Sequence, residues 1–138
     1  MVVHVETDKE IMDCFETLKE LRPSLQKEGF VDRVRDMYSE GYRLISETKN
    51  NDVIAVAGFR ILSNFAMGRK LYIEDLVTSE AVRSKGFGKI LLDYLESFAK
   101  QEGCQVLHLD SGTQRHRAHK FYFTNNLEIF SYHFVKHI

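Results

Sequence analysis

The sequence predicts an α/β fold in which a central, mixed and mostly antiparallel twisted sheet carries helices on both faces. Three observations predict it. The run from Val53 to Leu62 is almost continuously apolar, as in a central strand covered on both sides. Strand and helix patterns follow one another in the order β-α-α-β-β-β-α-β-α-β. Residues 70–110 contain a strand, a glycine turn, a helix and a strand, the pattern of a crossover between parallel strands.

Composition limits the class of protein. The 138 residues fit a single domain, 1–138, with 43% hydrophobic residues and one proline. A formal net charge of −1 gives no reason to expect a nucleic acid or an acidic membrane as partner. No apolar run approaches the ~20 residues of a membrane helix. Cys14 and Cys104 have no metal-ligand spacing, so we expect a reduced, cytoplasmic protein, although the sequence leaves a disulfide open.

The N-terminal part predicts a short strand over residues 2–6 and two helices. Thr7 and Glu10 match a capping box. The first helix then presents Ile11, Phe15 and Leu18 on one face and ends near Pro23, which lacks an N–H donor. The second helix ends at Gly41, and its apolar face consists of Phe30, Val34, Met37 and Tyr38.

The rest of the chain predicts mostly strands, with two more helices. Residues 42–48 and 53–62 form a hairpin around "KNND", and 70–78 form the next strand. A helix covers about 86–101, with an apolar face of Ile90, Leu91, Tyr94, Leu95 and Phe98. A short strand over 106–110, a helix over 115–125 and a last strand over 129–135 complete the chain.

The stretch "VRSKGFGKILL" places a glycine turn between a strand and a helix. The N–H groups of the first helical turn lack intrahelical partners, and the helix dipole favours an anion there. Gly86 and Gly88 allow close approach, and Arg83, Lys85 and Lys89 add positive charge. A dinucleotide fingerprint would need a third glycine at position 91, and a P-loop would need Ser or Thr at position 90. The turn alone therefore indicates either a different phosphate site or a plain helix start.

Two segments together resemble a known family. "YIEDLVTSEAVRSKGFGKILLDYLESFAKQEG" resembles the acetyl-CoA motif of the GNAT superfamily of N-acetyltransferases, and "RAHKFYFTNNL" resembles its next segment, Ala-x-x-Phe-Tyr. The resemblance implies the GNAT fold, acetyl-CoA as donor and a primary amine, on a small molecule or a protein, that attacks directly in a ternary complex. The cofactor-binding residues that it implies are Leu76, Val77, Thr78, Arg83, Ser84, Lys85, Gly86, Phe87, Gly88, Lys89, Arg115, Ala118 and Tyr122.

The sequence departs from this pattern at two positions. Arg115 stands where many members of the family have asparagine, which puts one cofactor contact in doubt. Asn126 stands where a glycine often follows the helix, a milder change because asparagine tolerates a left-handed backbone.

The resemblance also suggests catalytic residues. Tyr122 is the candidate acid that protonates the departing thiolate, against the alternative of a packed aromatic. Glu74 and Asp75 are candidate bases, because an ammonium must lose a proton before it attacks. Adjacent strand residues point to opposite faces, so only one should line the cleft unless a bulge intervenes. We prefer Glu74; a water relay is the alternative.

Several assignments stay open at this stage. Asp110, at the end of a strand, is a candidate for holding the substrate amine. Phe65 either packs in its loop or lines an acceptor pocket. His116 and His119 have no third ligand, so we expect no metal site.

A non-catalytic acyl-CoA-binding module that acts through a protein partner is the alternative function. The chain is a monomer or a homodimer, depending on whether the last strand completes its own sheet or pairs across two copies.

Overall fold

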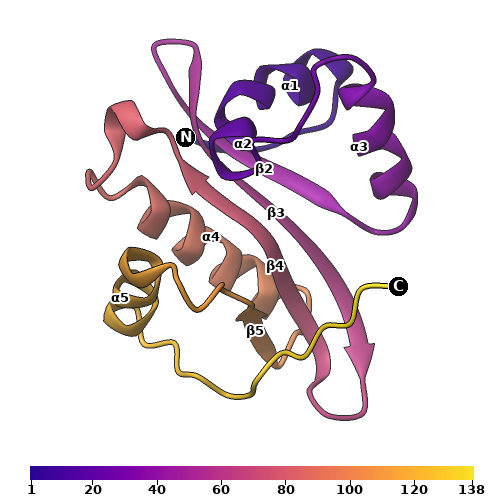
Figure 1. Cartoon of the computed structure of the whole chain (residues 1–138), viewed down its shortest axis with the longest axis vertical. Coiled ribbons are helices and arrows are strands. Elements are labelled where there is room, and N and C mark those ends of the chain that lie inside the picture. The colour runs from indigo at the N-terminus through magenta and orange to yellow at the C-terminus, as the bar shows by residue number, and fades with distance from the viewer. The chain divides into compact units, whose positions relative to one another are not determined.

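The computed structural model describes all 138 residues (Figure 1). Two compact units divide the chain, Met1–His108 and Leu109–Ile138. The strands are β1 (Val2–His4), β2 (Arg43–Lys49), β3 (Asp52–Asn64), β4 (Gly68–Thr78) and β5 (Val106–Leu109). The helices are α1 (Asp8–Asp13), α2 (Phe15–Leu21), α3 (Phe30–Ser39), the short 3-10 helix η1 (Glu80–Val82), α4 (Phe87–Gln101) and α5 (His116–Thr124).

The sheet confirms the predicted mixed arrangement. Its five strands lie in the order β1-β2-β3-β4-β5, and the first four pair antiparallel. The predicted hairpin closes at Lys49 and Asp52, with Asn50 and Asn51 both at positive φ, as a tight two-residue turn requires. Strand β5 runs parallel to β4. The N–H of Gln105 donates to the carbonyl of Arg69 at 2.7 Å, and three residues further along each strand the rings of His108 and Tyr72 stack.

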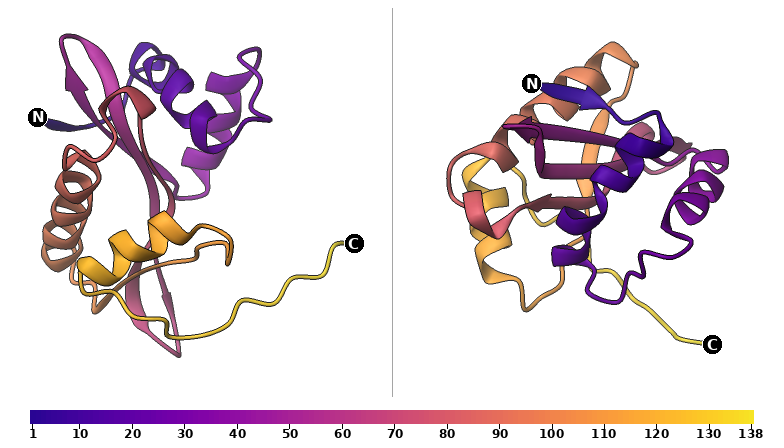
Figure 2. Two further views of the ribbon diagram at one scale, coloured as in Figure 1. Left: turned by 60° about the vertical axis from the view of Figure 1, so that its left-hand side comes forward. Right: turned by 90° about the horizontal axis from the view of Figure 1, so that it is seen from above.

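Helices cover both faces of the sheet within the first unit (Figure 2). Helices α1–α3 bury a core against one face, and the Thr7–Glu10 capping box starts α1 as predicted. The predicted first helix is broken in two at Cys14, whose N–H bonds to Ile11 three residues back instead of four. The core on this face consists of Val5, Ile11, Cys14, Phe15, Leu18, Phe30, Val34, Tyr42, Leu44, Val56 and Val77.

Helix α4 covers the other face. It buries Leu91, Leu92, Leu95 and Ala99, and Phe98 meets Phe59 of β3 edge-to-face with ring centroids 5.7 Å apart. Ile90, which we expected on the apolar face, is 43% exposed because it lies one residue before the buried stripe that Leu91 begins. No helix of the chain is both long and apolar enough to span a membrane.

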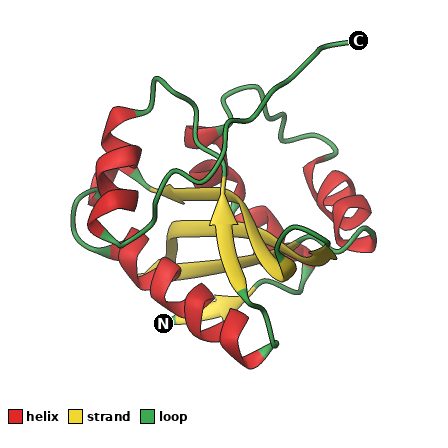
Figure 3. Cartoon of the chain, turned by 90° about the horizontal axis from the view of Figure 1, so that it is seen from below, coloured by secondary structure: helices red, strands yellow, loops and turns green.

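The second unit contains α5 and the C-terminal segment. Helix α5 matches its prediction to within one residue at each end, and Asn126 takes the left-handed φ of 66° expected after it. The last strand, expected over 129–135, is wrong: the whole segment after α5 is loop (Figure 3). Alternating aromatic residues give a segment strand propensity, but a strand exists only where its backbone pairs with a neighbour. Here Phe130, Tyr132 and Phe134 are all exposed.

Candidate active site

The glycine turn leads from η1 into α4. Gly86 is the N-cap of α4 at φ 89°, a left-handed conformation that favours glycine, and an added Cβ there would meet no atom within 4 Å. Backbone geometry, and not crowding, therefore selects glycine at this position. No side chain caps the helix, so the N–H groups of its first turn stay available to a ligand. The side chains of Arg83 and Lys85 are exposed, whereas Lys89 pairs with Asp93 at 2.5 Å.

Strand β4 extends well beyond its short neighbour β5. The two strands begin side by side, but β5 has 4 residues and β4 has 11. Residues Leu76, Val77 and Thr78 pair with β3 on one side and have no partner strand on the other. This edge leads through Ser79 and η1 to the glycine turn. The backbone edge without a partner strand and the uncapped N-terminus of α4 therefore follow one another along the sequence.

A β-bulge in β4 places two carboxylates on one face of the sheet. Consecutive residues of β3, Gly58 and Phe59, pair with Asp75 and Ile73, which leaves Glu74 as the extra residue. Only one of the two acids was expected to line a cleft unless a bulge intervened; the bulge is present, so the alternation of side chains is broken and this exception applies. Asp75 accepts a hydrogen bond from the Tyr42 hydroxyl, and Glu74 accepts one from Arg60, whose guanidinium lies over the Tyr42 ring. Both carboxylates therefore lie on the face of the sheet that α1–α3 cover.

Each of these carboxylates has its own cationic partner. The Glu74 Oε1 atom accepts from Arg60 Nε at 2.5 Å, and no hydrogen bond reaches its Oε2 atom. The Asp75 Oδ1 atom accepts from Arg22 Nε at 2.9 Å, while Oδ2 accepts from the Tyr42 hydroxyl at 2.6 Å. Asp75 thus uses both oxygens, and Glu74 keeps one available for another proton donor.

Tyr42 reaches Asp75 because β3 carries a glycine between them. Tyr42 is 3% exposed, and a Cβ placed on Gly58 would overlap its hydroxyl and its ring. Burial, together with the neighbouring charge of Asp75, raises the pKa of Tyr42 well above the ordinary value of a phenol. The hydroxyl therefore stays protonated and can only donate to the carboxylate.

Four predicted site residues lie in the second unit: Asp110, Arg115, Ala118 and Tyr122. Tyr122 lies in α5, and burial raises its pKa, an effect that the charge of Arg115 at the N-cap partly opposes. Ala118 is in the first turns of the same helix. Asp110 is exposed and lies 3.7 Å from His133 in the C-terminal segment. The His119 ring bonds to the carbonyl of Gly112 at 2.8 Å, which accounts for that histidine without a metal.

Comparison with known proteins identifies the family. The model of the acetyltransferase (GNAT) family matches residues 8–124. The chain belongs to this family. It is 36% identical over 115 residues to the uncharacterized N-acetyltransferase YhdJ of Bacillus subtilis, a match that covers 83% of this chain and 81% of that one. This GNAT chain is thus an acyltransferase of a family that uses acetyl-CoA.

Solved structures share the GNAT fold over their full length. A putative acetyltransferase from Agrobacterium tumefaciens is 22% identical, with a TM-score of 0.86 and coverage of 100% of this chain and 99% of that one. AAC(6')-Iy, solved in complex with a bisubstrate analogue of CoA, is 11% identical, with a TM-score of 0.87 and coverage of 100% and 97%. At these identities the likeness concerns the fold of the GNAT chain.

One other predicted site residue of this GNAT chain, Phe65, lies away from the bulge. Phe65 is fully exposed in the loop that joins β3 to β4, about 20 Å along the hairpin from Gly58 at roughly 3.3 Å per residue. The structure therefore does not bring Phe65 to the two carboxylates. No group of three or more His, Cys, Asp or Glu side chains is arranged to hold a metal ion.

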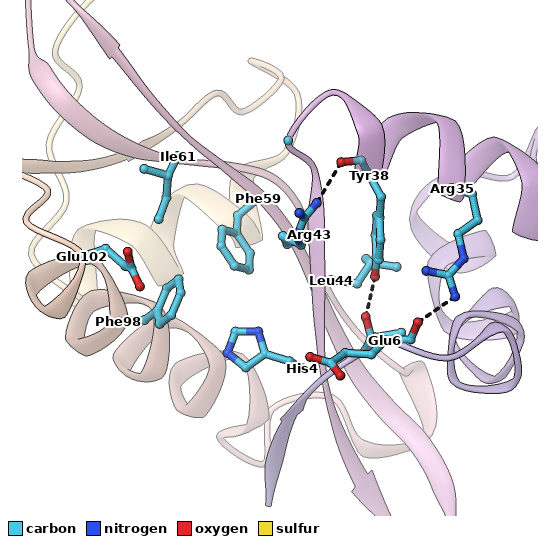
Figure 4. Close-up of a pocket in the computed structure, with 12 residues that line it drawn as sticks. His4, Glu6, Arg35, Tyr38, Arg43, Leu44, Phe59, Ile61, Phe98 and Glu102 are labelled. Atoms are coloured by element: carbon cyan, nitrogen blue, oxygen red, sulfur yellow. Dashed lines mark hydrogen bonds between the residues drawn. The ribbon is translucent and has the colours of Figure 1, made fainter.

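A cavity of about 410 Å³ lies between β1–β3 and the ends of α3 and α4 (Figure 4). Phe59 and Phe98 form part of its wall, and Arg43 donates there to the carbonyl of Tyr38 at 2.9 Å, which satisfies the last turn of α3. Neither the glycine turn nor Glu74 lines it. The cavity is thus separate from the bulge and from the uncapped N-terminus of α4.

Four residues of the bulge network were not anticipated from sequence. Arg22 follows α2, Tyr42 precedes β2, and Gly58 and Arg60 lie in β3, so these residues meet only through tertiary structure. The nearest signal was Pro23, which marks Arg22 as the residue just beyond a helix.

Proposed function

We propose that this protein transfers the acetyl group of acetyl-CoA to a primary amine of a small molecule or an exposed protein amino group. The amine attacks the thioester directly in a ternary complex. The observation that carries the proposal is the uncapped N-terminus of α4 behind a left-handed Gly86, with Arg83 and Lys85 exposed beside it. The family membership of the chain supports acetyl-CoA as the ligand.

The donor would bind along β4 and the glycine turn. The pyrophosphate takes the N–H groups of Phe87, Gly88 and Lys89, and Ser84 lines the same turn. The pantetheine arm pairs with the unpartnered edge of Leu76, Val77 and Thr78, much as a peptide adds to a sheet. An N–H group of this edge then faces the thioester oxygen, where negative charge develops.

The proton transfers are assigned to two residues. Glu74 is the proposed base, because its Oε2 atom is not hydrogen-bonded and can accept a proton directly or through a water. Tyr122 is the proposed acid for the thiolate; its raised pKa keeps the phenol protonated at neutral pH, as an acid requires. Asp110 and Arg115 stay proposed contacts of the substrate and the cofactor. A non-catalytic acyl-CoA-binding role is the alternative, and it would need none of these groups.

Calorimetry with acetyl-CoA tests the proposal. Gly86→Glu should abolish binding, because the new carboxylate repels a phosphate at the helix N-terminus. Gly103→Glu is the matched control: Gly103 lies at the other end of α4, has φ 75° and also has open space around it. Equal loss of binding in both variants, or no binding by the wild type, would refute the donor site.

Location in the cytoplasm stays a prediction, which the two free cysteines support.

A further inference from the structure

Arg22 covers the exposed side of the Asp75 carboxylate. Its Nε atom lies 2.9 Å from Asp75 Oδ1, and its Nη2 atom donates to the carbonyl oxygen of Glu74 at 3.0 Å. The Arg22 side chain is 51% exposed, whereas that of Asp75 is 12% exposed. A cation that is half in solvent therefore closes access to a carboxylate that is mostly buried.

The two sides of Asp75 differ in how easily they can be exchanged. The Tyr42 hydroxyl on the inner side belongs to a residue of the core. Arg22 on the outer side is the C-cap of α2, outside any regular element, and is followed by Pro23 and a loop. The guanidinium is half exposed and lies outside any helix or strand, so it can leave the carboxylate without disturbing the fold, provided that another cation takes its place.

Helix α2 itself does not need to move for this exchange. Its last turn is fixed to η1, which follows β4, because Glu20 accepts from the N–H of Glu80 at 2.9 Å. The N–H of Arg22 also bonds to Leu18. Only the Arg22 side chain has to swing away, and the two acceptors that it leaves are then exposed to an incoming group.

Charge indicates what that group is. Glu74 and Asp75 carry two negative charges, which Arg22 and Arg60 balance. Departure of Arg22 leaves one net negative charge, while Arg60 remains bonded to Glu74 and to the carbonyl of Glu40. A monovalent cation restores the balance. An ammonium has three N–H donors, two of which match the acceptors vacated by Arg22.

We propose that Arg22 holds the place of the acceptor's ammonium group, and that Asp75 binds the acceptor in exchange for this guanidinium. The inference rests on the proposed function and adds the class of acceptor. Acceptors enter as ammonium ions of basic primary amines, and neutral or anionic acceptors are excluded. In this arrangement Asp75 positions the amine beside Glu74, and Arg22 competes with every acceptor. The opposite possibility is that Arg22 itself binds an anionic group of the acceptor.

NMR titration separates the two possibilities with three simple probes. The probes are n-butylammonium, n-butanol and butyrate, and the signal is the Arg22 side-chain Nε–H resonance of the wild-type chain. We expect n-butylammonium to shift this resonance and the other two probes to leave it unchanged. A shift caused by butyrate, or the absence of any shift with n-butylammonium, would overturn the inference.

Variants then test the competition quantitatively. Arg22→Gln should bind n-butylammonium about 5-fold more tightly or better, because the competing guanidinium is gone and its pair with a mostly buried carboxylate is at least as strong as an exposed ion pair. Arg33→Gln, an exposed arginine of α3, is the matched control and should bind as the wild type does. Asp75→Asn should lose binding. Unchanged or weaker binding by Arg22→Gln refutes the exchange even if acetyl-CoA still binds, whereas loss of acetyl-CoA binding refutes the proposed function on its own.

Discussion

The hydroxyl of Tyr42 donates a hydrogen bond to Asp75 at 2.6 Å across an intervening strand. The bond is possible only because β3 has Gly58 at the crossing point, directly opposite Asp75 in the register. One glycine thus sets the position of a carboxylate in the candidate site. This relationship leads to the first prediction.

Gly58→Ala should destabilise the protein by about 1–3 kcal/mol, because the new methyl group overlaps the Tyr42 ring and a packed core yields only with strain. Urea unfolding measures the free-energy change. The double variant Gly58→Ala, Tyr42→Leu provides the control, since leucine ends short of the overlapping atoms. If Gly58→Ala lowers the free energy of unfolding as much in the Tyr42→Leu background as in the wild type, the clash is not the cause.

Stability should fall in alkali because buried groups keep their protons. Burial raises the pKa of the Cys14 thiol from 9.0 to about 12 and that of the Tyr38 phenol from 10.0 to about 12. Above pH 9 the unfolded chain releases these protons and the folded chain does not, so the free energy of unfolding decreases as pH rises. Each group lowers the free energy of unfolding by up to about 1.4 kcal/mol per pH unit, until about pH 12.

Unfolding curves between pH 7 and pH 11 measure this slope. Cys14→Ala should show a smaller decrease above pH 9 than the wild type, even though its stability at neutral pH is lower. Cys104→Ala is the control, because Cys104 is only partly buried. A slope that Cys14→Ala leaves unchanged would contradict the assignment of the pH dependence to that thiol.

The two thiols should also differ in reactivity. Both cysteines are free, and at pH 8 the buried Cys14 is a neutral thiol, which is a poor nucleophile. We expect a disulfide reagent to modify one thiol per folded chain, at Cys104, and two after denaturation. The variant Cys104→Ala should then show no fast reaction in the folded state. Rapid modification of Cys14 in that variant would disprove its burial.

Local patterns predicted much of the fold. The capping box at Thr7, the Asn50–Asn51 hairpin and the left-handed Asn126 after α5 each depend on neighbours in the sequence, and all three are present. The strand expected over 129–135 failed because a strand also needs a partner, which its own residues do not encode. The alternating residues predicted only a propensity for a strand, and the lack of a neighbouring strand to pair with decided the structure.

The candidate site could be predicted only in part for the same reason. The sequence indicated Glu74 and Asp75, but the bulge that turns both to one face depends on how β3 and β4 pair. The contact between Tyr42 and Asp75 joins residues 33 positions apart in the chain. Such long-range relationships leave no periodic signal in a single sequence.

Tyr122→Phe should lower the rate of acetyl transfer by about 10²-fold, the lower end for loss of a general acid, with unchanged affinity for acetyl-CoA. Tyr132→Phe is the matched control, because Tyr132 lies exposed in the C-terminal loop. Steady-state kinetics with a basic primary amine and calorimetry with acetyl-CoA provide the two measurements. Equal rates for Tyr122→Phe and the wild type would remove Tyr122 from the mechanism.

The two carboxylates of the bulge should have separable roles. Glu74→Gln removes the proposed base, so kcat should fall by about 10²-fold with little change in the KM for the amine. Asp75→Asn removes the proposed partner of the ammonium, so KM should rise more than kcat falls. This separation follows from the hydrogen bonds: Glu74 has an oxygen available for a proton, whereas both oxygens of Asp75 already accept bonds that fix its position. If Glu74→Gln changes only KM, or if Asp75→Asn changes only kcat, the roles of the two acids are reversed and a base bonded to Tyr42 must be considered in place of Glu74.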